Sequence, residues 1–300
     1  GTHFGGASVN GNSNFRRNYE PLLPGVFHLA APYPYRNPFG TDDPQEIAAA
    51  IARQFEDEIA FQSADTIAAL IMEPVLGAGG VMVPHETFMP MMRAICDRHG
   101  ILLIADEVIT AFGRTGAWSG SRLWGVKPDL MATAKAITNG YYPFGAVMIA
   151  EKVAEAFEAD RTAFGSIGHG YTYSGHPVGA AAALATLKET RRLDVAANAA
   201  ARGNELFAGL RGLKQRHDLV GDVRGKGLMC ALELVSDRAK KTAASKDVVQ
   251  RVQDVAYEAG VMIRTSGANV IISPPLVITA GDVDRILSAL EAGLTAGAAG

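Results

Sequence analysis

Two residues of chemically useful type stand at the ends of two short apolar runs. Asp106 closes the run ILLIAD (101–106), and Lys135 follows the run LMATA (130–134). If both runs are strands of a parallel sheet, their carboxyl ends meet at one edge, where ligands of such sheets bind. Partial burial of a lysine at that edge disfavours its ammonium form, and the free amine can then condense with a carbonyl compound to form a Schiff base.

This pair of residues matches what enzymes that use pyridoxal phosphate require. They need a lysine that forms a Schiff base with the cofactor, and an anion that keeps the pyridine nitrogen protonated so that the ring accepts electrons. Asp106 and Lys135 are 135 − 106 = 29 residues apart, which is the length of a crossover with a helix between neighbouring strands. The alternative is a buried acid in a structural salt bridge and a lysine at a strand end, and the pair alone does not exclude it.

The chain around these residues predicts the strands that would carry them. Four apolar runs have strand length without polar alternation: 67–73, 101–106, 130–134 and 145–150. Such runs, separated by helical patterns, are typical of a parallel sheet covered by helices on both faces. We therefore expect an α/β fold with a mostly parallel sheet. Because Glu73 closes the first run as Asp106 closes the second, Glu73 joins Asp106 and Lys135 as a candidate for the same site.

Two helices are predicted in the first hundred residues. Asp43 and Glu46 have the spacing of an N-cap and a capping-box acid, and apolar residues follow at four-residue intervals over 47–59. A second helical pattern surrounds Met92 and stops at Gly100.

The chain changes in texture after residue 177. An Ala-rich helical pattern over 177–217 is predicted to break or kink near Leu193 and Gly203. The remaining predictions are strands at 226–235, 261–264 and 270–273, helices at 246–259 and 282–296, a fraying tail over 291–300, and a short strand at 26–29 in a loop-rich start. We expect a large domain over residues 1–200, incomplete at its N-terminus because the chain opens without methionine, and a smaller α+β domain over 201–300.

Composition narrows the class of protein. With 300 residues, of which 48% are hydrophobic, the chain can bury one large core or a core and a smaller one. A net charge of −3 gives no reason to expect nucleic acid or an anionic membrane as a partner. Cys96 and Cys230 form no CxxC pattern and are predicted to be reduced core thiols, and no apolar run is long enough to span a membrane. We expect a cytoplasmic protein without a bound metal.

Four motifs around Asp106 and Lys135 favour a pyridoxal phosphate site over a structural salt bridge. They occur in this order: EPVLGAGGVMVP (73–84), ADEVITAFGRTG (105–116), ATAKAITNG (132–140) and HGYTYSGHPVGAAAAL (169–184). Together they resemble the class III aminotransferases, which are pyridoxal phosphate enzymes of fold type I. The resemblance continues through VRGKGLMCALELV (223–235) and VMIRTSGANVIISPPLVIT (261–279).

The resemblance implies a role for each matching residue. Lys135 would carry the Schiff base with pyridoxal phosphate and then move the proton at the substrate Cα. Asp106 would pair with the pyridinium nitrogen, and Val108 would pack against one face of the ring. Glu73 looks like the family's acid on the substrate side, although strand-end capping explains it equally well.

The loop at 169–176 is implied to bind the cofactor phosphate. Thr172 would hydrogen-bond the phosphate group, and in this family the threonine reaches across from the partner subunit. Its neighbour Tyr171 is a further expected cofactor-binding residue. Glycines around it suit a tight loop that presents a hydroxyl and amide groups to an anion. The resemblance therefore implies a homodimer with shared active sites.

Two positions, Ala78 and Arg264, point to one branch of the family. Ala78 stands where relatives acting on ornithine, acetylornithine or 4-aminobutyrate carry a glutamate. Ile109 stands where some members have a glutamine that bonds the phenolic oxygen of the cofactor, so that contact cannot be made here. Arg264 aligns with the mobile arginine that the amine:pyruvate branch uses to bind an α-carboxylate, for which a guanidinium is well shaped. We expect transfer of an amino group from an amine or ω-amino acid to pyruvate or a related 2-oxo acid.

Two other interpretations remain open from the sequence. The same lysine and aspartate would serve a racemase, decarboxylase or aminomutase on this scaffold. In the family, a Tyr-His-Gly motif and a phosphate loop precede the region that matches the start of this chain, so an inactive, truncated chain is the second alternative.

Overall fold

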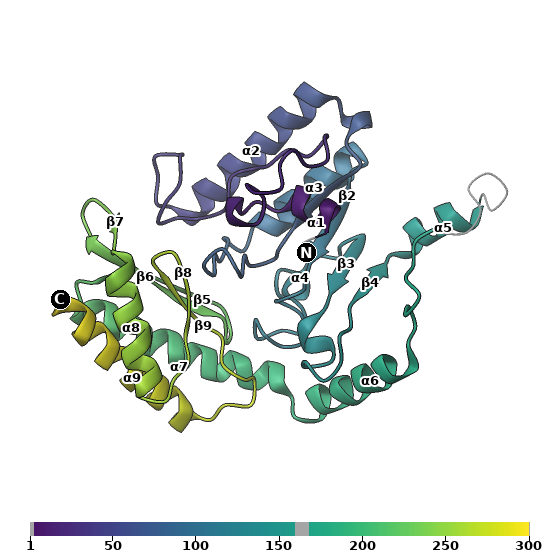
Figure 1. Cartoon of the computed structure of the whole chain (residues 1–300). Coiled ribbons are helices and arrows are strands. Elements are labelled where there is room, and N and C mark those ends of the chain that lie inside the picture. Colours follow the sequence, from purple (N-terminus) through teal and green to yellow (C-terminus); the bar gives the residue numbers. More distant parts are fainter. Residues whose placement is uncertain (1–2, 160–167, 300) are drawn as a thin grey trace.

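The computed structural model describes residues 3–159 and 168–299 and contains two sheets (Figure 1). The first has four strands in the order β1-β2-β3-β4, and the second has five strands, β5 to β9. The long helices α6 (Pro177–Arg192) and α7 (Val195–Arg216) follow one another along the chain from the first sheet to the second.

The first sheet contains all four predicted strands. They are β1 (Ala69–Met72), β2 (Leu102–Asp106), β3 (Leu130–Thr133) and β4 (Ala146–Ile149). β1, β2 and β3 pair in parallel, whereas β4 runs antiparallel to β3. An antiparallel neighbour needs no helical crossover, and only the short η3 (Lys135–Ile137) and turns lie between β3 and β4.

Two helices cover this sheet where the sequence predicts them. α2 (Pro44–Gln62) begins at Asp43, whose Oδ1 accepts hydrogen bonds from the amides of Gln45 (2.7 Å) and Glu46 (3.0 Å). α3 (Phe88–His99) ends at Gly100, which has a left-handed φ of 70°. The apolar stripe of α2 and the buried face of α3 share one core with Leu103 of β2. Cys96 lies in this core, and Cys230 lies in the core beside the second sheet. Burial raises the pKa of each thiol to about 12.

Two expectations for the first part of the chain are wrong, and one helix is missed. Residues 26–29 form no strand, and the crossover between β2 and β3 contains only the four-residue α4 (Gly120–Leu123) in place of a full helix. The sequence patterns also do not predict the helix α5 (Glu151–Ala159). The other short elements are α1 (Phe4–Val9), η1 (Ser13–Phe15) and η2 (Ala64–Thr66).

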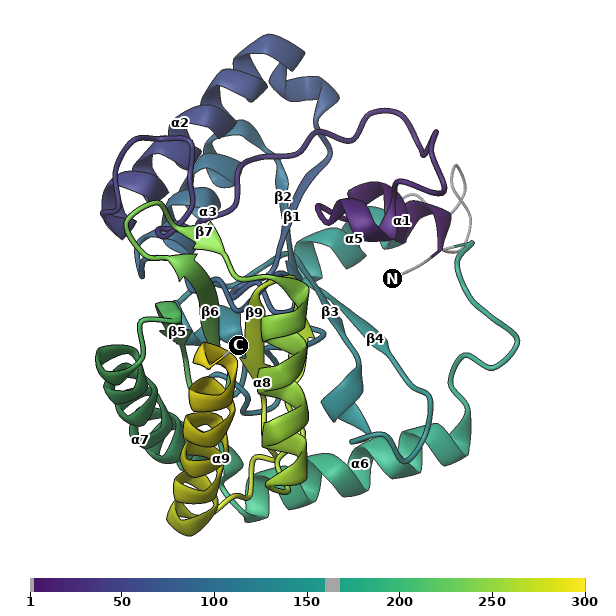
Figure 2. The same cartoon turned by 60° about the vertical axis from the view of Figure 1, so that its left-hand side comes forward.

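The second sheet is antiparallel and carries helices on one face (Figure 2). Its strands are β5 (Val220–Gly225), β6 (Cys230–Asp237), β7 (Thr242–Ala243), β8 (Arg264–Ser266) and β9 (Asn269–Ile272), ordered β5-β6-β9-β8 with β7 on β6. α7, α8 (Lys246–Glu258) and α9 (Ala280–Ala298) share one buried core with β5, β6 and β9.

Several boundaries in this part differ from the prediction. β5 is absent from the predicted strands, β6 begins at Cys230 and not at residue 226, and β8 begins at Arg264, where a strand is predicted to end. The tail, which is predicted to fray, is helical to Ala298, because Leu290 and Leu294 are buried and the small residue Gly293 lets α9 approach α8 at Val252.

The predicted break between α6 and α7 is present, but the kink at Gly203 is not. Asp194, with a φ of 44°, separates the two helices, whereas Gly203 lies inside the continuous α7. A Cβ atom on Gly203 would overlap the backbone of Gly227, so this glycine serves a close contact between helix and turn. Within the described residues, none of the helices combines the length and the apolar character that crossing a membrane requires.

Candidate active site

Asp106 and Lys135 come together because β2 and β3 are neighbours. Asp106 is the last residue of β2 and lies opposite Ala132 of β3, and Lys135 follows three residues later at the start of η3. Lys135 has a φ of 46°, which is unfavourable for a residue with a side chain. Strained backbone of this kind concentrates at functional sites, and here it turns the chain immediately after the strand.

Lys135 lies within reach of the charges of the other predicted site residues. Burial lowers the pKa of Lys135, and the charge of Arg264 lowers it further, whereas the carboxylates of Asp106 and Glu73 raise it. The net direction is downward, which increases the share of free amine at a given pH. Three other predicted residues, Asp106 and Glu73 at the ends of strands of the first sheet and Arg264 on the second, thus act on the charge state of Lys135.

Glu73 follows β1 at the same edge. Its carboxylate accepts a hydrogen bond from the amide of Gly77 (2.9 Å). Burial, aided by the charge of Asp106, raises the pKa of Glu73 to about 7, against the lowering effects of the Gly77 amide and of Lys135. Near neutral pH, Glu73 therefore exchanges between a neutral acid and an anion, and it does not add a full negative charge beside Lys135.

Asp106 is fixed by its own turn. One carboxylate oxygen, Oδ1, accepts a hydrogen bond from the amide of Val108 (3.1 Å), and both residues are half-buried. A carboxylate anchored in this way at a strand end, with an amine across the neighbouring strand, suits a ligand that carries a cationic ring nitrogen and a carbonyl. The Asp106 carboxylate and the Lys135 amine thus fit the ring nitrogen and the carbonyl of pyridoxal phosphate.

Glu107 is a site residue that sequence reasoning missed. It is fully buried, and its carboxylate accepts hydrogen bonds from the amide and hydroxyl of Ser121, the amide of Gly120 and the hydroxyl of Thr110. Its own amide donates to the Ala132 carbonyl (2.9 Å), which extends the β2–β3 pairing past Asp106. The available signal is a second acid directly after Asp106, because a charge so close to a buried strand needs partners.

Asp129 holds the same two strands from the other end. Its carboxylate accepts hydrogen bonds from the amide of Leu103 (2.7 Å) and from Arg93 (2.8 Å), and it forms an ion pair with Lys152. Burial raises the pKa of Asp129, but these donors outweigh it and bring the pKa below its ordinary value.

Tyr171 and Thr172 stand apart from this group. Both are exposed, and the amide of Tyr171 donates to the Ser174 hydroxyl (2.9 Å) within the loop. His176 ends the loop, caps α6 by accepting from the amide of Val178 (3.2 Å), and stacks on a tyrosine ring. Within the described residues, no hydrogen bond links this loop to Lys135, Asp106 or Glu73.

Arg264 occupies the first position of β8 with an exposed side chain. Its backbone pairs with Ile271 of β9. The Gln253 side chain of α8 donates to the Ile263 carbonyl (3.2 Å) and accepts from the Thr265 hydroxyl (3.3 Å), so the backbone is held on both sides of Arg264.

Arg114 connects the two sheets beneath this site. It lies in the turn after β2, and its Nη1 donates to the carbonyl oxygens of Leu228 (2.9 Å) and Pro274 (2.6 Å). Burial lowers the pKa of Arg114 to about 10. Gly227, with a φ of 58°, is required beside it, because a Cβ there would overlap the backbone of the same turn.

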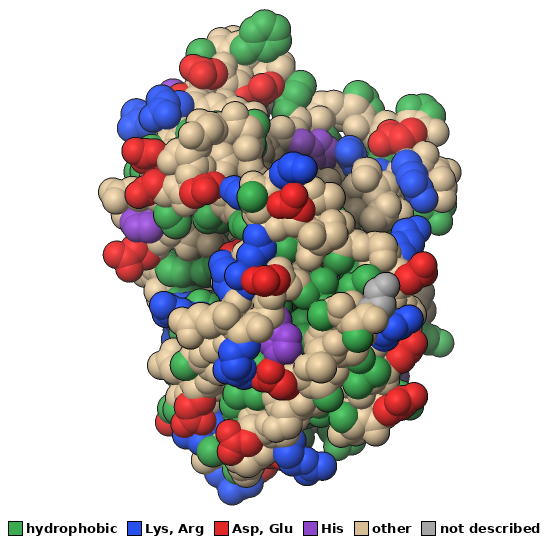
Figure 3. Space-filling view, turned by 90° about the vertical axis from the view of Figure 1, so that its left-hand side faces the viewer, with side chains coloured by type: hydrophobic (Ala, Val, Ile, Leu, Met, Phe, Trp, Pro, Cys, Tyr) green, Lys and Arg blue, Asp and Glu red, His purple; other side chains and the backbone are tan. Residues whose placement is uncertain are grey.

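On the face shown in Figure 3, basic and acidic side chains are interspersed, and no broad area carries a single sign of charge. This distribution agrees with the net charge of −3.

Comparison with known proteins supports the same cofactor chemistry as the geometry of the site. A family model described as "Aminotransferase class-III" matches residues 1–294. The putrescine–pyruvate aminotransferase of Pseudomonas aeruginosa is 37% identical over 289 residues, which are 96% of this chain and 62% of that protein. The taurine–pyruvate aminotransferase of Bilophila wadsworthia is 34% identical over 306 residues, 98% of this chain and 66% of that protein.

A solved structure is similar along nearly the whole chain. An amine transaminase from an uncultivated Pseudomonas species, in its PLP-bound form, superposes with a TM-score of 0.96 at 48% identity, and the match covers 98% of this chain and 67% of that one. The present chain thus spans about 62% of the length of the first curated relatives that it matches.

Proposed function

The chain belongs to the class III aminotransferases, and on that premise we propose that it transfers an amino group from an amine or ω-amino acid to pyruvate or a related 2-oxo acid, with pyridoxal phosphate as cofactor. The observation that carries the proposal is the meeting of Lys135, Asp106 and Glu73 at the carboxyl ends of β1 to β3. The match to a PLP-bound amine transaminase supports the choice of cofactor.

The residues of this site divide the chemistry between them. When bound, pyridoxal phosphate supplies an electron-accepting ring that stabilises negative charge at the substrate Cα. Asp106 would accept a hydrogen bond from the protonated ring nitrogen, and Val108 would pack against the ring. Lys135 would hold the cofactor covalently through its amine. Once released, that amine would move the proton at the substrate Cα, for which its lowered pKa suits it.

Arg264 supports pyruvate as the amino acceptor, and so does Ala78, which stands where relatives acting on ornithine, acetylornithine or 4-aminobutyrate carry a glutamate. The guanidinium of Arg264 can pair with an α-carboxylate through two parallel hydrogen bonds, and its charge reaches Lys135. Its exposed side chain, on a backbone held by Gln253, can also leave room for the uncharged substituent of an amine. Two relatives whose names contain pyruvate support the same assignment.

We further propose a homodimer in which Thr172 and Tyr171 bind the cofactor phosphate of the partner subunit. Their loop is exposed and has no hydrogen bond to Lys135 or Asp106 among the described residues. Apolar side chains are exposed on β4, on this loop and on α6, which is typical of a surface that another chain covers: Val147, Met148, Tyr171, Tyr173, Val178 and Leu184.

Complementation tests the shared site. A Lys135→Ala chain and a Thr172→Ala chain, each weakly active or inactive alone, should regain turnover when they are co-refolded, because each mixed dimer contains one intact site. If mixing restores no activity although mixed dimers form, Thr172 acts within its own subunit; a fully active Thr172→Ala chain would show that it has no role in the site.

The domain division also remains a proposal. We assign residues 1–200 to the large cofactor-binding domain and residues 201–300 to the smaller α+β domain. One buried cluster, from Ala199 to Leu294, accounts for the core of the second part and supports this division.

The decisive experiment follows alanine formation. The purified chain is loaded with pyridoxal phosphate and given pyruvate and one amine at a time. Lys240→Ala is the control for Lys135→Ala, because Lys240 is an exposed lysine whose ion pair in the described part of the chain is with Asp237. Alanine should form with wild type and the control and should be lost in Lys135→Ala. Borohydride should also attach one pyridoxyl phosphate to the wild type and the control but not to Lys135→Ala.

Alanine formation by Lys135→Ala at the wild-type rate would overturn the mechanism. Amine consumption without a matching loss of pyruvate would favour a racemase, decarboxylase or aminomutase. Failure of the wild type to trap the cofactor would favour an inactive chain.

A further inference from the structure

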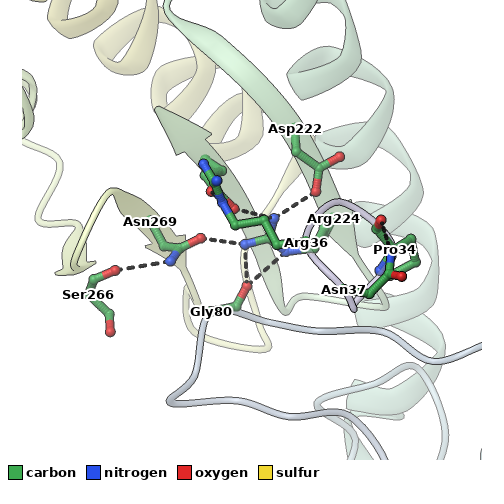
Figure 4. A network of polar contacts seen from close by, with 9 residues as sticks. Pro34, Arg36, Asn37, Gly80, Asp222, Arg224, Ser266 and Asn269 are labelled. Carbon is green, nitrogen blue, oxygen red and sulfur yellow. Dashed lines mark hydrogen bonds and ion pairs between the residues drawn. The ribbon is translucent and has the colours of Figure 1, made fainter. Parts of the chain in front are cut away.

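The hairpin that presents Arg264 is fastened at its turn by a second arginine. Arg224 of β5 donates through Nη2 to the side-chain oxygen of Asn269, the first residue of β9 (Figure 4). The amide nitrogen of the same asparagine side chain donates to the Ser266 carbonyl (3.0 Å). Because Ser266 and Asn269 are the pair that closes the hairpin, Arg224 holds both of its strands two register positions from Arg264.

The same guanidinium holds the loop that begins at Glu73. Nε and Nη2 of Arg224 donate to the Gly80 carbonyl at 3.0 and 2.8 Å. The near end of this loop is fixed by the bond from the Gly77 amide to the Glu73 carboxylate. Gly80 has a φ of 122°, and a Cβ there would lie 3.0 Å from the Asn269 side chain, so loop and hairpin are in close contact beside Arg224.

Arg224 is itself held rigidly. It is 7% exposed, and its Nη1 contacts the carboxylates of Asp222 (2.6 Å) and Glu233 (3.2 Å). Its guanidinium also lies over the ring of Tyr33, 4.7 Å from the centroid, and Arg36 contacts the other carboxylate oxygen of Glu233 (2.5 Å). All three guanidinium nitrogens are thus in use, in a planar arrangement that a lysine ammonium cannot reproduce.

We propose that Arg224 is a positioning residue for carboxylate recognition: it fixes the Glu73–Gly80 loop against the β8–β9 hairpin and so sets where Arg264 meets the carboxylate of a 2-oxo acid. The inference rests on the proposed function, because it presupposes that Arg264 binds this carboxylate. Gln253 fixes the base of the hairpin and Arg224 its turn, so the backbone stays in place while the exposed side chain of Arg264 adapts.

The test compares two arginines of the same domain. Arg224→Met removes the fork and keeps an apolar side chain of similar length. Arg238→Met is the matched control, because Arg238 also donates to backbone carbonyls, those of Val220, Lys214 and His217, but contacts neither the hairpin nor the loop. In the cofactor-loaded chain, KM is measured for pyruvate and for an amine that lacks a carboxylate.

Arg224→Met should raise the KM for pyruvate by about 10- to 100-fold, the range for a misplaced binding group, and leave the KM for the amine within about twofold. Arg224→Lys should not restore the pyruvate KM. Hydrogen exchange of the amides in 264–272 should be faster in Arg224→Met and unchanged in Arg238→Met. Asn269→Ser removes only the link between Arg224 and the hairpin, so it should also raise the KM for pyruvate selectively, but by less. This variant keeps the proposal testable if Arg224→Met does not fold.

The outcomes separate the two proposals. If wild type forms no alanine from pyruvate, the proposed function fails and this inference fails with it. If wild type and Arg264→Ala behave as proposed, but Arg224→Met and Asn269→Ser change both KM values equally or change neither, the function stands and Arg224 is only structural.

Discussion

Asp106 lies directly opposite Ala132 in the parallel pairing of β2 with β3, and Lys135 follows Ala132 by three residues along the chain. This register brings the carboxylate and the amine to the same edge of the sheet. Glu107 and Asp129 maintain the register from inside the core, because the amide of Glu107 extends the pairing and the carboxylate of Asp129 binds the β2 backbone.

Asp106→Asn tests the role of the carboxylate at this edge. The variant keeps the shape and can still accept from the Val108 amide, but it loses the charge that would stabilise a protonated ring nitrogen. We expect turnover to fall by roughly 10- to 150-fold, the equivalent of about 1.5–3 kcal/mol for a hydrogen bond to a charged group. Steady-state kinetics measure this, with Asp57→Asn on the exposed face of α2 as the control. Equal rates in both variants would remove Asp106 from the site.

Glu73→Gln should change how stability depends on pH. With a pKa of about 7 in the folded chain and about 4.5 when unfolded, Glu73 is ionised in the unfolded chain between these pH values and takes up a proton on folding. The wild type therefore loses stability as pH rises from 4.5 to 7, by about 3 kcal/mol in total, and the loss remains above pH 7. The glutamine side chain does not titrate. In urea unfolding, the free energy of unfolding of the variant relative to that of wild type should therefore rise by about this amount between pH 4.5 and 8.

Glu73→Ala separates the charge from the hydrogen bond. It follows the same pH trend, because the charge is gone, but it lacks an acceptor for the Gly77 amide. Its free energy of unfolding should therefore run below that of Glu73→Gln by a constant offset of about 1 kcal/mol. A pH-independent difference between wild type and Glu73→Gln would mean that Glu73 is not buried as an acid.

Arg264→Ala should weaken the acceptor far more than the donor. Loss of a guanidinium–carboxylate pair is expected to raise the KM for pyruvate by roughly 10- to 150-fold, from about 1.5–3 kcal/mol, while an amine without a carboxylate loses nothing. Arg264→Lys should recover part of the loss, because an ammonium keeps the charge without the fork. Arg285→Ala on the exposed side of α9 is the control. Parallel losses for pyruvate and amine would contradict the assignment.

Two glycines of α7 make a matched pair for stability. A Cβ on Gly203 would overlap the Gly227 backbone, whereas a Cβ on Gly212 would meet only the flexible end of Arg216, 3.3 Å away. Gly203→Ala should therefore destabilise the chain by about 1–3 kcal/mol through overpacking, and Gly212→Ala should stabilise it by about 0.5–1 kcal/mol through helix propensity. Urea midpoints compare them. A stabilised Gly203→Ala would show that α7 and the turn can move apart.

Local signals are sufficient for much of the first sheet. α2 follows from its cap at Asp43 and its apolar spacing, and α3 ends where Gly100 supplies a left-handed residue. The strands that end near Glu73, Asp106 and Lys135 follow from their uninterrupted apolar runs. These features depend on neighbours within a few residues of one another, so a pattern in the chain can reveal them.

Other features depend on distant parts of the chain. Gly203 has the pattern of a helix breaker, yet it makes a close contact with Gly227 inside a continuous helix. The small residues after Glu291 have the pattern of a frayed end, yet they let α9 pack against α8. β8 begins at Arg264 because it pairs with β9, and no local pattern specifies that pairing.

The family, the candidate lysine and its aspartate can be identified from the chain alone, because motifs and strand-end charges are local and the chemistry constrains their residue types. The residues that hold the lysine and the aspartate in place become visible only in the folded chain. Glu107 and Arg224 lie inside the quoted motifs and Asp129 and Gln253 outside them, but no pattern in the chain indicates which groups these four side chains bind. They matter because folding buries their polar groups, and a buried polar group is stable only where distant partners satisfy its hydrogen bonds.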